Sequence, residues 1–398
     1  MINFQGLDVN EFLTCYWQKK PLVIRKAIPA FVSPINGDEL AGLALEDEVE
    51  SRLVMYVADK KPFWHLKRGP LHESDFKTLP ATHWTLLVQG VDRFIPEVAS
   101  LLDHFDFIPQ WRVDDVMVSY AVEQGGVGPH YDHYDVFLFQ AQGRRKWSLT
   151  SRHCNPDNYL PDVTLRIMDN FLVEEEFILE EGDMLYLPPH IGHHGVSLSP
   201  DCITYSFGYR SYPARELWEG FGEYLAEHHI RHLYQDPCWA GMKGASEIPV
   251  QAIDQAKNTL LTLLSDDKKL REWFGCFVTR LDEQAEQLLS LEEEGSADME
   301  QFVVQLHKSK GFIRNSLCRF AYQQSDTSPN VILFVNGQCR DSVGADRELV
   351  RLVADHRSVT KTQLAPFLDH QENRLFLFKL WQSQWIFFQE SSLQGVLS

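Results

Sequence analysis

The sequence is short of basic residues. Its 398 residues include 37 lysines and arginines against 56 aspartates and glutamates, so the formal net charge is −19 at pH 7. Proteins that bind nucleic acids unaided, or that lie on anionic membranes, need positive charge to contact phosphates. The charge therefore excludes an unaided nucleic-acid binder and favours a basic protein as partner.

Long apolar runs and paired cysteine motifs are also missing. The longest apolar stretches, such as residues 136–139 and 385–388, are far shorter than the roughly 20 residues of a membrane span. The N-terminal sequence Met1-Ile2-Asn3-Phe4-Gln5 has neither the basic start nor the apolar core of a secretory signal, which predicts a cytoplasmic protein. The seven cysteines contain no Cys-x-x-Cys motif, so we expect reduced cysteines rather than a disulfide framework.

The apolar residues that are present predict a β-rich region first. Hydrophobic residues make up 44% of the chain, which is enough for substantial cores, and the length predicts two or three domains. Short strand-like runs between Asp114 and Ser211 are separated by glycine and proline turns; they cover residues 116–121, 136–139, 184–187 and 203–207. Strands at this rhythm predict an antiparallel sandwich or barrel.

A change of period marks the end of this region. After Pro213 the apolar residues recur at helical spacing, and a Glu-rich stretch at 292–296 has the composition of a linker. Beyond it, the run 331–335 followed by Asn336-Gly337 predicts a β-hairpin in a small mixed α/β, winged-helix-like unit. We therefore expect three parts, with boundaries at 1–212, 213–297 and 298–398.

Histidine and aspartate are spaced for metal binding in the β-rich region. Two imidazoles and one carboxylate on adjacent strands form a facial triad that holds Fe(II) and leaves positions open for substrate and O₂. A His-x-Asp sequence supplies two such ligands, because residues i and i+2 of a strand point to the same side. Three such sequences occur, and they are His104-Phe105-Asp106, His130-Tyr131-Asp132 and His133-Tyr134-Asp135.

The local context narrows these three. His104 follows Ala99-Ser100-Leu101-Leu102-Asp103, a stretch typical of a helix end where residues i and i+2 diverge, so we expect it to be structural. The other two pairs have opposite strand parity, so only one of them can face a pocket, and parity leaves both open. The third ligand is expected from Pro188-Pro189-His190-Ile191-Gly192-His193-His194-Gly195, where three histidines are candidates.

Several motifs together resemble the JmjC-type ribosomal oxygenases of the cupin superfamily, which depend on 2-oxoglutarate and Fe(II). The matching segments, in order, are Tyr16-Trp17-Gln18-Lys19-Lys20-Pro21-Leu22-Val23, Gly125-Gly126-Val127-Gly128-Pro129-His130-Tyr131-Asp132-His133-Tyr134-Asp135-Val136-Phe137, Gly143-Arg144-Arg145-Lys146-Trp147, Gly182-Asp183-Met184-Leu185-Tyr186-Leu187-Pro188-Pro189 and Tyr205-Ser206-Phe207-Gly208-Tyr209-Arg210. The likeness is strongest to the bacterial branch, the arginine hydroxylases that act on the sixteenth protein of the large ribosomal subunit.

The resemblance implies a fold and a set of site residues. It implies a mostly β catalytic core, a double-stranded β-helix or jelly roll, followed by an α-helical dimerisation region and a winged-helix-like C-terminal domain. It assigns His130, Asp132 and His193 as the Fe(II) ligands. Arg145, fifteen residues after His130, stands where the family binds the distal carboxylate of 2-oxoglutarate, and a guanidinium suits a carboxylate because it donates two charge-assisted hydrogen bonds.

Other residues are weaker candidates. Hydroxyl side chains on strands that flank the same pocket are candidates for contacts with 2-oxoglutarate; these are Ser119, Tyr120, Thr204 and Ser206. Tyr134 and Asp135 are expected at the pocket mouth, where a carboxylate would pair with an incoming arginine. His133 is then expected beside the substrate rather than on the metal.

The resemblance therefore implies a 2-oxoglutarate-dependent dioxygenase that consumes O₂ and hydroxylates the β-carbon of an arginine in a basic ribosomal protein. Two rival interpretations are a metal-binding cupin that acts on a small molecule without redox chemistry, and a non-catalytic dimeric scaffold. Apolar stripes with Trp218, Phe221, Trp273 and Phe274 predict a homodimer formed by the helical region. The alternative is that these stripes pack on the barrel.

Overall fold

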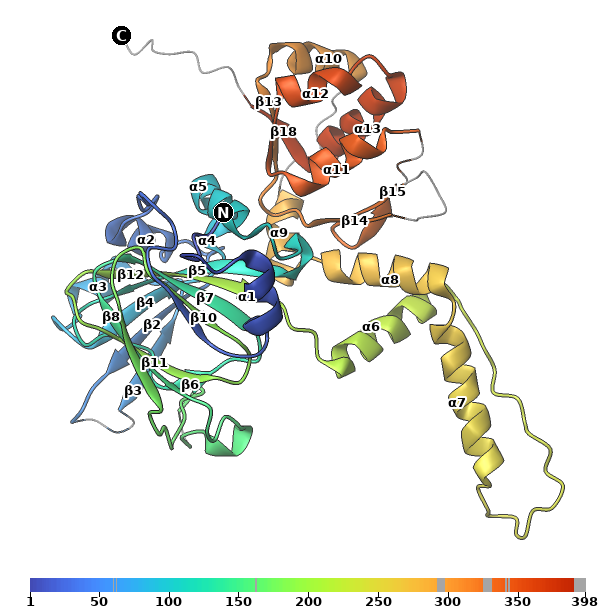
Figure 1. The fold of residues 1–398 in the computed structure, drawn as a ribbon, viewed down its shortest axis with the longest axis horizontal. Coiled ribbons are helices and arrows are strands. Elements are labelled where there is room, and N and C mark those ends of the chain that lie inside the picture. Colours follow the sequence, from blue (N-terminus) through green and yellow to red (C-terminus); the bar gives the residue numbers. More distant parts are fainter. Residues whose placement is uncertain are drawn as a thin grey trace.

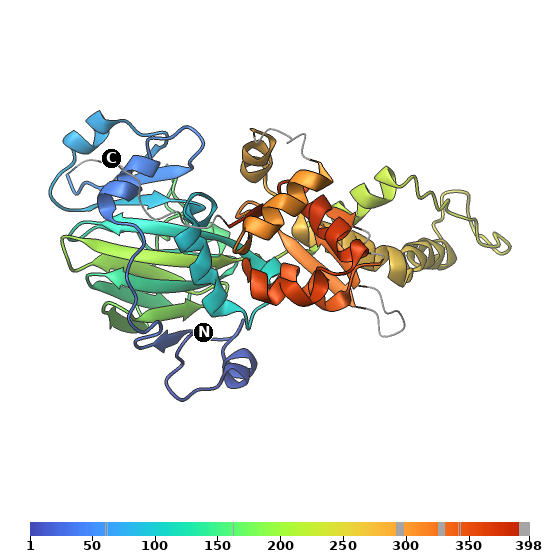
Figure 2. The ribbon, with the colours of Figure 1, turned by 90° about the horizontal axis from the view of Figure 1, so that it is seen from above.

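The structure is a computed structural model that describes residues 1–59, 61, 63–161, 163–291, 298–324, 331–340, 342 and 344–389. Figure 1 shows a β-rich N-terminal part, a helical region that projects from it, and a C-terminal unit of helices and short strands. Figure 2 shows the same three parts from above. The predicted linker at 292–296 lies outside the described residues.

Two antiparallel sheets form the N-terminal part. Over the described residues, the larger sheet has the order β1-β10-β7-β12-β5-β4-β2-β3 and the smaller has the order β6-β11-β8-β9. The strands are β1 (Leu22–Ile24), β2 (Ser51–Tyr56), β3 (Trp64–Arg68), β4 (Trp84–Val88), β5 (Val113–Ala121), β6 (His130–Tyr131), β7 (Asp135–Gln142), β8 (Arg145–Thr150), β9 (Glu175–Leu179), β10 (Met184–Leu187), β11 (Gly192–Ser197) and β12 (Cys202–Tyr209). This jelly roll confirms the predicted mostly β core.

Strand alternation divides the larger sheet into two faces. Phe137 and Phe139 of β7 belong to a large core on the outer face, whereas Val136 and Leu138 belong to a small core between the sheets. In β12, similarly, residues 203, 205 and 207 join the outer core, while 204, 206 and 208 line a pocket. A single strand therefore contributes residues to both the core and the pocket, because successive side chains point to opposite faces.

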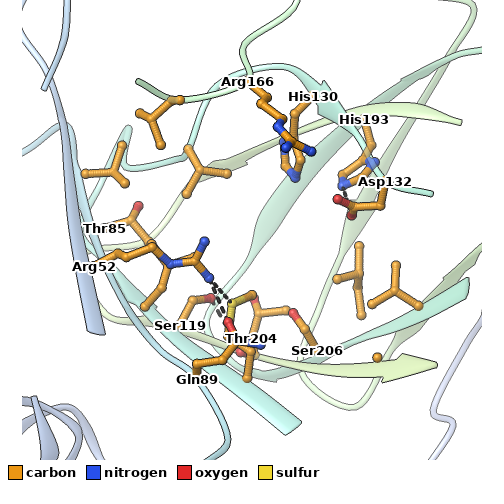
Figure 3. A pocket seen from close by; sticks show the side chains of 18 of the residues that line it. Arg52, Thr85, Gln89, Ser119, His130, Asp132, Arg166, His193, Thr204 and Ser206 are labelled. Carbon is orange, nitrogen blue, oxygen red and sulfur yellow. Dashed lines mark hydrogen bonds and ion pairs between the residues drawn. The ribbon is translucent and has the colours of Figure 1, made fainter. Parts of the chain in front are cut away.

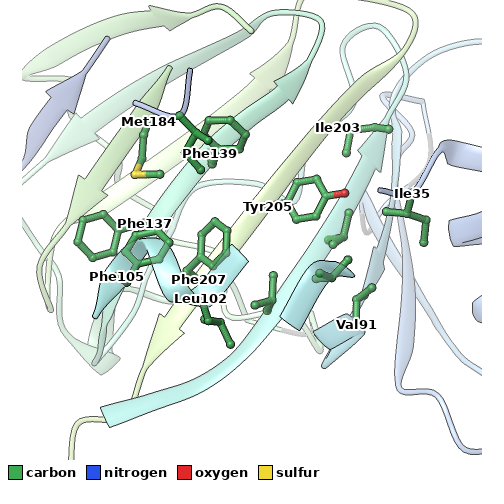
Figure 4. Close-up of a cluster of buried hydrophobic side chains, with 14 of the residues drawn as sticks. Ile35, Val91, Leu102, Phe105, Phe137, Phe139, Met184, Ile203, Tyr205 and Phe207 are labelled. Atoms are coloured by element: carbon green, nitrogen blue, oxygen red, sulfur yellow. The ribbon is translucent and has the colours of Figure 1, made fainter. Parts of the chain in front are cut away.

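Short helices cover the outer face. They are α1 (Val9–Cys15), α2 (Gly37–Leu43), α3 (Glu73–Lys77), α4 (Val91–Phe94), α5 (Pro96–Ser100) and the 3₁₀-helices η1 (Leu101–Phe105) and η2 (Gln110–Arg112). A further 3₁₀-helix, η3 (Pro156–Asn158), lies in the segment between β8 and β9. Phe12 of α1, Leu40 of α2 and Phe105 of η1 pack on the sheet, and Figure 4 shows Phe105 beside Phe137 and Phe207. This apolar layer fixes the sheet whose other face carries the pocket.

The larger sheet extends further than the sequence predicts. Strands β2, β3 and β4 precede residue 114, where the expected β-rich region begins. They pair in the order β5-β4-β2-β3 and continue the sheet beyond β5. The apolar run Trp84–Val88 was a strand signal that the sequence interpretation left unused.

The helical region contains α6 (Ala214–Glu227), α7 (Val250–Leu264), α8 (Asp267–Thr279) and α9 (Glu283–Leu291). Of the predicted apolar stripes, Phe221 and Trp273 are buried in one cluster, together with Trp111 and Tyr212 of the N-terminal part. Trp218 remains 54% exposed. Part of the apolar surface therefore packs within the chain, and part of it stays open.

The C-terminal unit has a core of its own. It contains α10 (Met299–Lys308), β13 (Gly311–Arg314), β14 (Phe320–Gln324), β15 (Val331–Val335), β16 (Gln338–Arg340), α11 (Arg347–Asp355), β17 (Ser358–Thr360), α12 (Lys361–Leu364), η4 (Ala365–Phe367), α13 (Gln371–Gln382) and β18 (Ile386–Phe388). The predicted hairpin is present, and Asn336 and Gly337 have φ angles of 50° and 76°, as a type I′ turn requires. In the α8 helix, Gly275 lies so close to Phe334 of β15 that a Cβ would sit 2.4 Å from the ring.

Across the described part of the chain, every helix is too short or too polar to cross a bilayer.

Candidate metal centre and cosubstrate pocket

A cavity of about 640 Å³ opens between the two sheets. Most of the residues proposed from the sequence line it, namely Ser119, His130, Asp132, His133, Tyr134, Arg145, His193, Thr204 and Ser206. They come from strands β5, β6, β8, β11 and β12 and from the segment that follows β6. Figure 3 shows His130, Asp132 and His193 on one side of the cavity, with Ser119, Thr204 and Ser206 across from them.

Strand register brings the two candidate histidine ligands together. β6 and β11 are antiparallel, and His193 lies directly opposite His130. Their ring centroids are 4.2 Å apart, and Nε2 of His193 lies 3.7 Å from Oδ2 of Asp132. Within the described residues, one ligand atom from each of these three side chains lies within 4.8 Å of the others. Two imidazoles and one carboxylate at this spacing fit a facial triad for Fe(II).

Backbone carbonyls orient both imidazoles. Nδ1 of His130 lies 3.0 Å from the carbonyl oxygen of Gly128, and Nδ1 of His193 lies 3.0 Å from that of Ile191. When Nδ1 donates its proton there, Nε2 keeps a lone pair for a metal. Gly128 has φ of +83°, a left-handed conformation that favours glycine in the turn before His130.

Burial keeps one imidazole neutral. Removal from solvent, followed by repulsion from His130, lowers the pKa of His193 to about 4. Only an unprotonated imidazole can bind a metal ion, so His193 is in its ligand form at neutral pH. Burial lowers the pKa of His194 to about 4 as well. His194, however, lies beside the ring of Phe171 and has the opposite strand parity to His193.

Arg145 carries a buried positive charge without a partner. Its side chain faces the pocket because Arg145 pairs with Ser197, on the same face of β8 and β11 as His193. The residue is 5% exposed, and among the described residues Nε and Nη2 have no hydrogen-bond partner. The guanidinium lies 5.7 Å from the ring of Trp147. A buried, unpaired guanidinium is costly, so this site fits a carboxylate ligand.

The hydroxyl candidates differ in their existing contacts. Ser119 donates to the carbonyl oxygen of Thr204 at 3.4 Å, and Thr204 donates to Oε1 of Gln140 at 3.2 Å. Ser206 is buried beside them and also lines the pocket. Tyr120 has the opposite parity to Ser119, and its hydroxyl donates to Asp201 instead of reaching the pocket. Its expected role beside 2-oxoglutarate is therefore wrong.

Tyr134 and His133 lie where the pocket continues into a second hollow of about 280 Å³. Tyr134 is 41% exposed, which is compatible with a place at the mouth. The ring of His133 lies 4.9 Å from that of His190, away from the ligand cluster.

The expectation for Asp135 is wrong. Asp135 is fully buried, and it lines neither the main pocket nor the hollow at its mouth. Its carboxylate accepts hydrogen bonds from Tyr186 at 2.6 Å and from Gln18 at 3.1 Å, and it lies 3.5 Å from Arg112. At the start of β7, its side chain has the parity of Phe137 and therefore points into the outer core, not toward the pocket mouth.

A polar wall opposite the ligands was missed. Arg52 of β2, Gln89 directly after β4 and Asp115 of β5 form a chain of contacts along the pocket (Figure 3 labels the first two). Arg52 donates to Oε1 of Gln89 at 2.7 Å, and Gln89 donates to Oδ2 of Asp115 at 2.7 Å. The early strands that carry Arg52 and Gln89 gave no motif, so sequence spacing alone carried no signal for them.

Asp115 is a second ionisable group in the pocket that can accept a further hydrogen bond. It is 4% exposed, and burial together with the nearby carboxylate of Asp92 raises its pKa to about 7. The backbone N–H of Gly90 also donates to Oδ2, at 2.9 Å. Within the described chain both bonds end on Oδ2, so Oδ1 retains capacity for another donor.

Comparisons with known proteins agree with this geometry. The chain matches a family described as JmjC domain over residues 100–217 and one described as ROXA-like winged helix over residues 262–387. The second match begins within α7, which agrees with the packing of α8 on β15. The chain is 43% identical over 205 residues to the probable ribosomal oxygenase of Haemophilus influenzae, covering 51% of this chain and 49% of that one.

Two Escherichia coli matches cover more of the chain. The ribosomal protein uL16 3-hydroxylase is 37% identical over 277 residues, covering 69% of this chain and 72% of that one. The structure of YcfD, a ribosomal oxygenase, in complex with cobalt and 2-oxoglutarate has a TM-score of 0.80 and 30% identity, covering 96% of this chain and 98% of that one. With this identity and this coverage, the chain belongs to the family of JmjC-domain ribosomal oxygenases.

Proposed function

We propose that this 2-oxoglutarate- and Fe(II)-dependent hydroxylase acts on the β-carbon of an arginine in the large-subunit ribosomal protein uL16. One observation supports this proposal most. The same pocket contains the cluster of His130, Asp132 and His193 and a guanidinium, that of Arg145, whose Nε and Nη2 have no hydrogen-bond partner among the described residues. The substrate is inferred from likeness to the E. coli uL16 3-hydroxylase.

Different residues of the pocket would bind the metal and the cosubstrate. His130, Asp132 and His193 would hold Fe(II), and Arg145 would hold the distal carboxylate of 2-oxoglutarate. Bound iron and 2-oxoglutarate supply the activation of O₂ that hydroxylation of an unactivated C–H bond needs. The chain itself positions the cosubstrate, because the Arg145 guanidinium is held in place beside Trp147 on the same face as His193.

The segment between β8 and β9 covers the pocket near the metal ligands. Asn158 donates to the carbonyl oxygen of Asn170 at 2.9 Å and accepts from its N–H at 2.9 Å, which closes the loop on itself. The N–H of Met168 donates to the carbonyl of Pro129, directly before His130. The neighbouring Ile167 is buried and lines the pocket. This loop limits the access of water to the reacting C–H bond.

Asp115 supports arginine as the target side chain. A guanidinium entering the pocket can donate to Oδ1 of Asp115 and restore the ionised carboxylate that burial disfavours. The overall charge of −19 also favours encounter with a basic ribosomal protein, and we place the reaction in the cytoplasm.

The decisive experiment incubates the purified chain with Fe(II), 2-oxoglutarate and recombinant uL16. We expect uL16 to gain the mass of one oxygen atom in step with succinate formation, and tandem mass spectrometry to place the oxygen on an arginine. Replacement of that arginine by lysine in uL16 should abolish the mass gain. Oxygen on a histidine would contradict the substrate, and failure to consume 2-oxoglutarate with any large-subunit protein would contradict the reaction class.

The two rival interpretations fit the pocket less well. A small-molecule cupin without redox chemistry gives no reason for the buried, unpaired Arg145. A non-catalytic scaffold gives no reason for three ligand atoms within 4.8 Å of one another, oriented by backbone carbonyls.

We also propose that the chain forms a homodimer through α7. Figure 1 shows this helix projecting away from the barrel, and none of its side chains is buried. Apolar residues on and before it are strongly exposed, with Ile248 at 77%, Val250 at 69% and Ile253 at 60%. A protein rarely leaves such a surface in water, and a second copy presents the same apolar face.

Light scattering coupled to size exclusion tests this proposal. We expect a dimer for the unaltered chain and a monomer for the double variant Ile253→Asp with Leu260→Asp. The double variant Gln251→Asp with Asn258→Asp adds the same two negative charges on the opposite, polar face of the helix and should stay dimeric. A monomeric unaltered chain at micromolar concentration would contradict the proposal.

A further inference from the structure

A second cavity of about 490 Å³ lies between the barrel and the C-terminal unit. Helices α4, α5, η1 and η2 form its barrel side, while β13, β18 and the segment 315–319 form the other side. Asp114, at the start of β5, borders both this cavity and the pocket of the metal ligands. The remaining walls of the two cavities are different.

Three arginines of the C-terminal unit reach this cavity and bind the barrel. Arg314 donates through Nη2 to Oε1 of Gln110 at 2.8 Å, and Arg357 donates through Nε to the carbonyl of Ala99 at 3.1 Å. Arg319 donates through Nη1 and Nη2 to the carbonyls of Val113 and Asp114, both at 3.0 Å. These acceptors are uncharged. Arg319 also lies 3.7 Å from Oδ1 of Asp114 and 3.9 Å from Oδ2 of Asp282, which compensate its charge.

In the described part of the chain, Arg357 forms one ion pair and Arg314 forms none. The partner of Arg357 is Asp103, whose Oδ1 lies 3.6 Å from Nε. Nη1 of Arg357 is buried and has no hydrogen-bond partner among the described residues. Burial, and then repulsion from Arg357, lower the pKa of Arg314 to about 9.

Apolar side chains form one part of the remaining wall, and the carboxylates of Asp92, Asp103 and Asp114 lie in another part. Phe320 lies under Arg314, with its ring centroid 5.3 Å from the guanidinium carbon. Leu102, Trp111 and Phe387 line the same space. A cavity that combines apolar surface with convergent charged groups is typical of small-molecule sites.

We propose that this cavity binds a small organic anion, whose carboxylate or phosphate group contacts Arg314 and Arg357 and whose apolar body lies against Phe320 and Trp111. An oxyanion would accept a hydrogen bond from the free N–H of Arg357 and place negative charge beside both guanidinium groups. The ligand would also link the two parts of the chain, because its arginine contacts belong to one part and Trp111 to the other.

Calorimetry with two matched probes tests the site and identifies the oxyanion. Benzoate and phenyl phosphate share a ring and differ in the charged group, and the tighter binder identifies the preferred chemistry. We expect Arg357→Gln to weaken binding about tenfold, the effect of losing one charge-assisted hydrogen bond. Arg145→Gln, in the metal-ligand pocket, should leave this binding unchanged, and Lys361→Gln serves as a control for loss of a surface charge.

Absence of binding by both probes at millimolar concentration would overturn the proposal. Binding that Arg145→Gln abolishes and Arg357→Gln preserves would overturn it as well. A crystal of the unaltered chain soaked in 4-bromobenzoate does not depend on how well a variant folds. An anomalous bromine peak between Phe320 and Arg357 supports the site, whereas a peak only in the metal-ligand pocket, or none, contradicts it.

Discussion

Asp132 and Asp135 belong to consecutive His-x-Asp sequences, three residues apart, yet they occupy opposite kinds of environment. Asp132 faces the pocket with His130 and His193, and its carboxylate is close enough to them to share one metal ion. Asp135 is fully buried on the other face, where Tyr186, Gln18 and Arg112 surround its carboxylate.

The difference shows how function and stability are separated within one sheet. On the core face, the polar groups of Asp135 and Tyr186 satisfy each other. On the pocket face, Asp132, Arg145 and Asp115 keep hydrogen-bonding capacity for something outside the chain. A buried polar group that lacks an internal partner is costly, so such groups mark the places where a ligand binds.

The sharpest test of this contrast removes Asp132. We expect Asp132→Ala to lower hydroxylation more than about 100-fold, because even the loss of groups that only orient a ligand costs about 10–100-fold. Metal binding should fall in parallel when it is measured by calorimetry with Co(II), and the melting temperature should stay near that of the unaltered chain. Full activity in this variant would show that Asp132 is not a metal ligand.

Arg145 should produce the next largest effect. Arg145→Ala is expected to raise the KM for 2-oxoglutarate about 100-fold, because two charge-assisted hydrogen bonds to its carboxylate are lost. The KM of Arg145→Lys for 2-oxoglutarate should lie between those of the unaltered chain and Arg145→Ala, since an ammonium keeps the charge but cannot donate two parallel hydrogen bonds. An unchanged KM for 2-oxoglutarate in Arg145→Ala would mean that another cation binds the cosubstrate.

Asp135 should behave in the opposite way to Asp132. Asp135→Asn is expected to lower the free energy of unfolding by about 2 kcal/mol, because hydrogen bonds to a buried charged group are weakened. The affinity for Co(II) should remain unchanged. Asp369→Asn, at an exposed position, is the matched control in urea denaturation. Loss of Co(II) binding in folded Asp135→Asn would contradict the separation of the two faces.

Asp115 should produce the smallest of these effects, a change of KM and of stability with pH. Its pKa of about 7 means that the carboxyl becomes ionised between pH 6 and 8, so the KM for the basic substrate should fall a few-fold over that range. The unfolded chain loses this proton near its ordinary value of 3.8, so the contribution of Asp115 to the free energy of unfolding falls as pH rises from 3.8 to about 7. Asp115→Asn should flatten both profiles, and an unflattened KM profile would exclude Asp115 as the titrating group.

The sequence predicted much of the pocket and misjudged parts of it. Motif resemblance chose His193 among three neighbouring histidines, and the structure brings it opposite His130. The placement of Asp135 at the pocket mouth was wrong, although strand parity carried a signal against it, because residues 132 and 135 lie on opposite faces of an extended strand. Arg52 and Gln89 were missed because they approach the pocket from strands far upstream.

By itself, the sequence determined the β-rich core, the helical region, the C-terminal hairpin and the residue types able to bind iron and a dicarboxylate. These features follow from local periodicity, turn residues and side-chain chemistry, all of which act over a few positions. Only the tertiary structure decided which carboxylate faces the pocket, which arginine N–H groups among the described residues are buried without an acceptor, and where two parts of the chain enclose a second cavity. Those outcomes depend on strand register and on contacts between distant segments, and a shift of one residue in register would reverse every side chain on a strand.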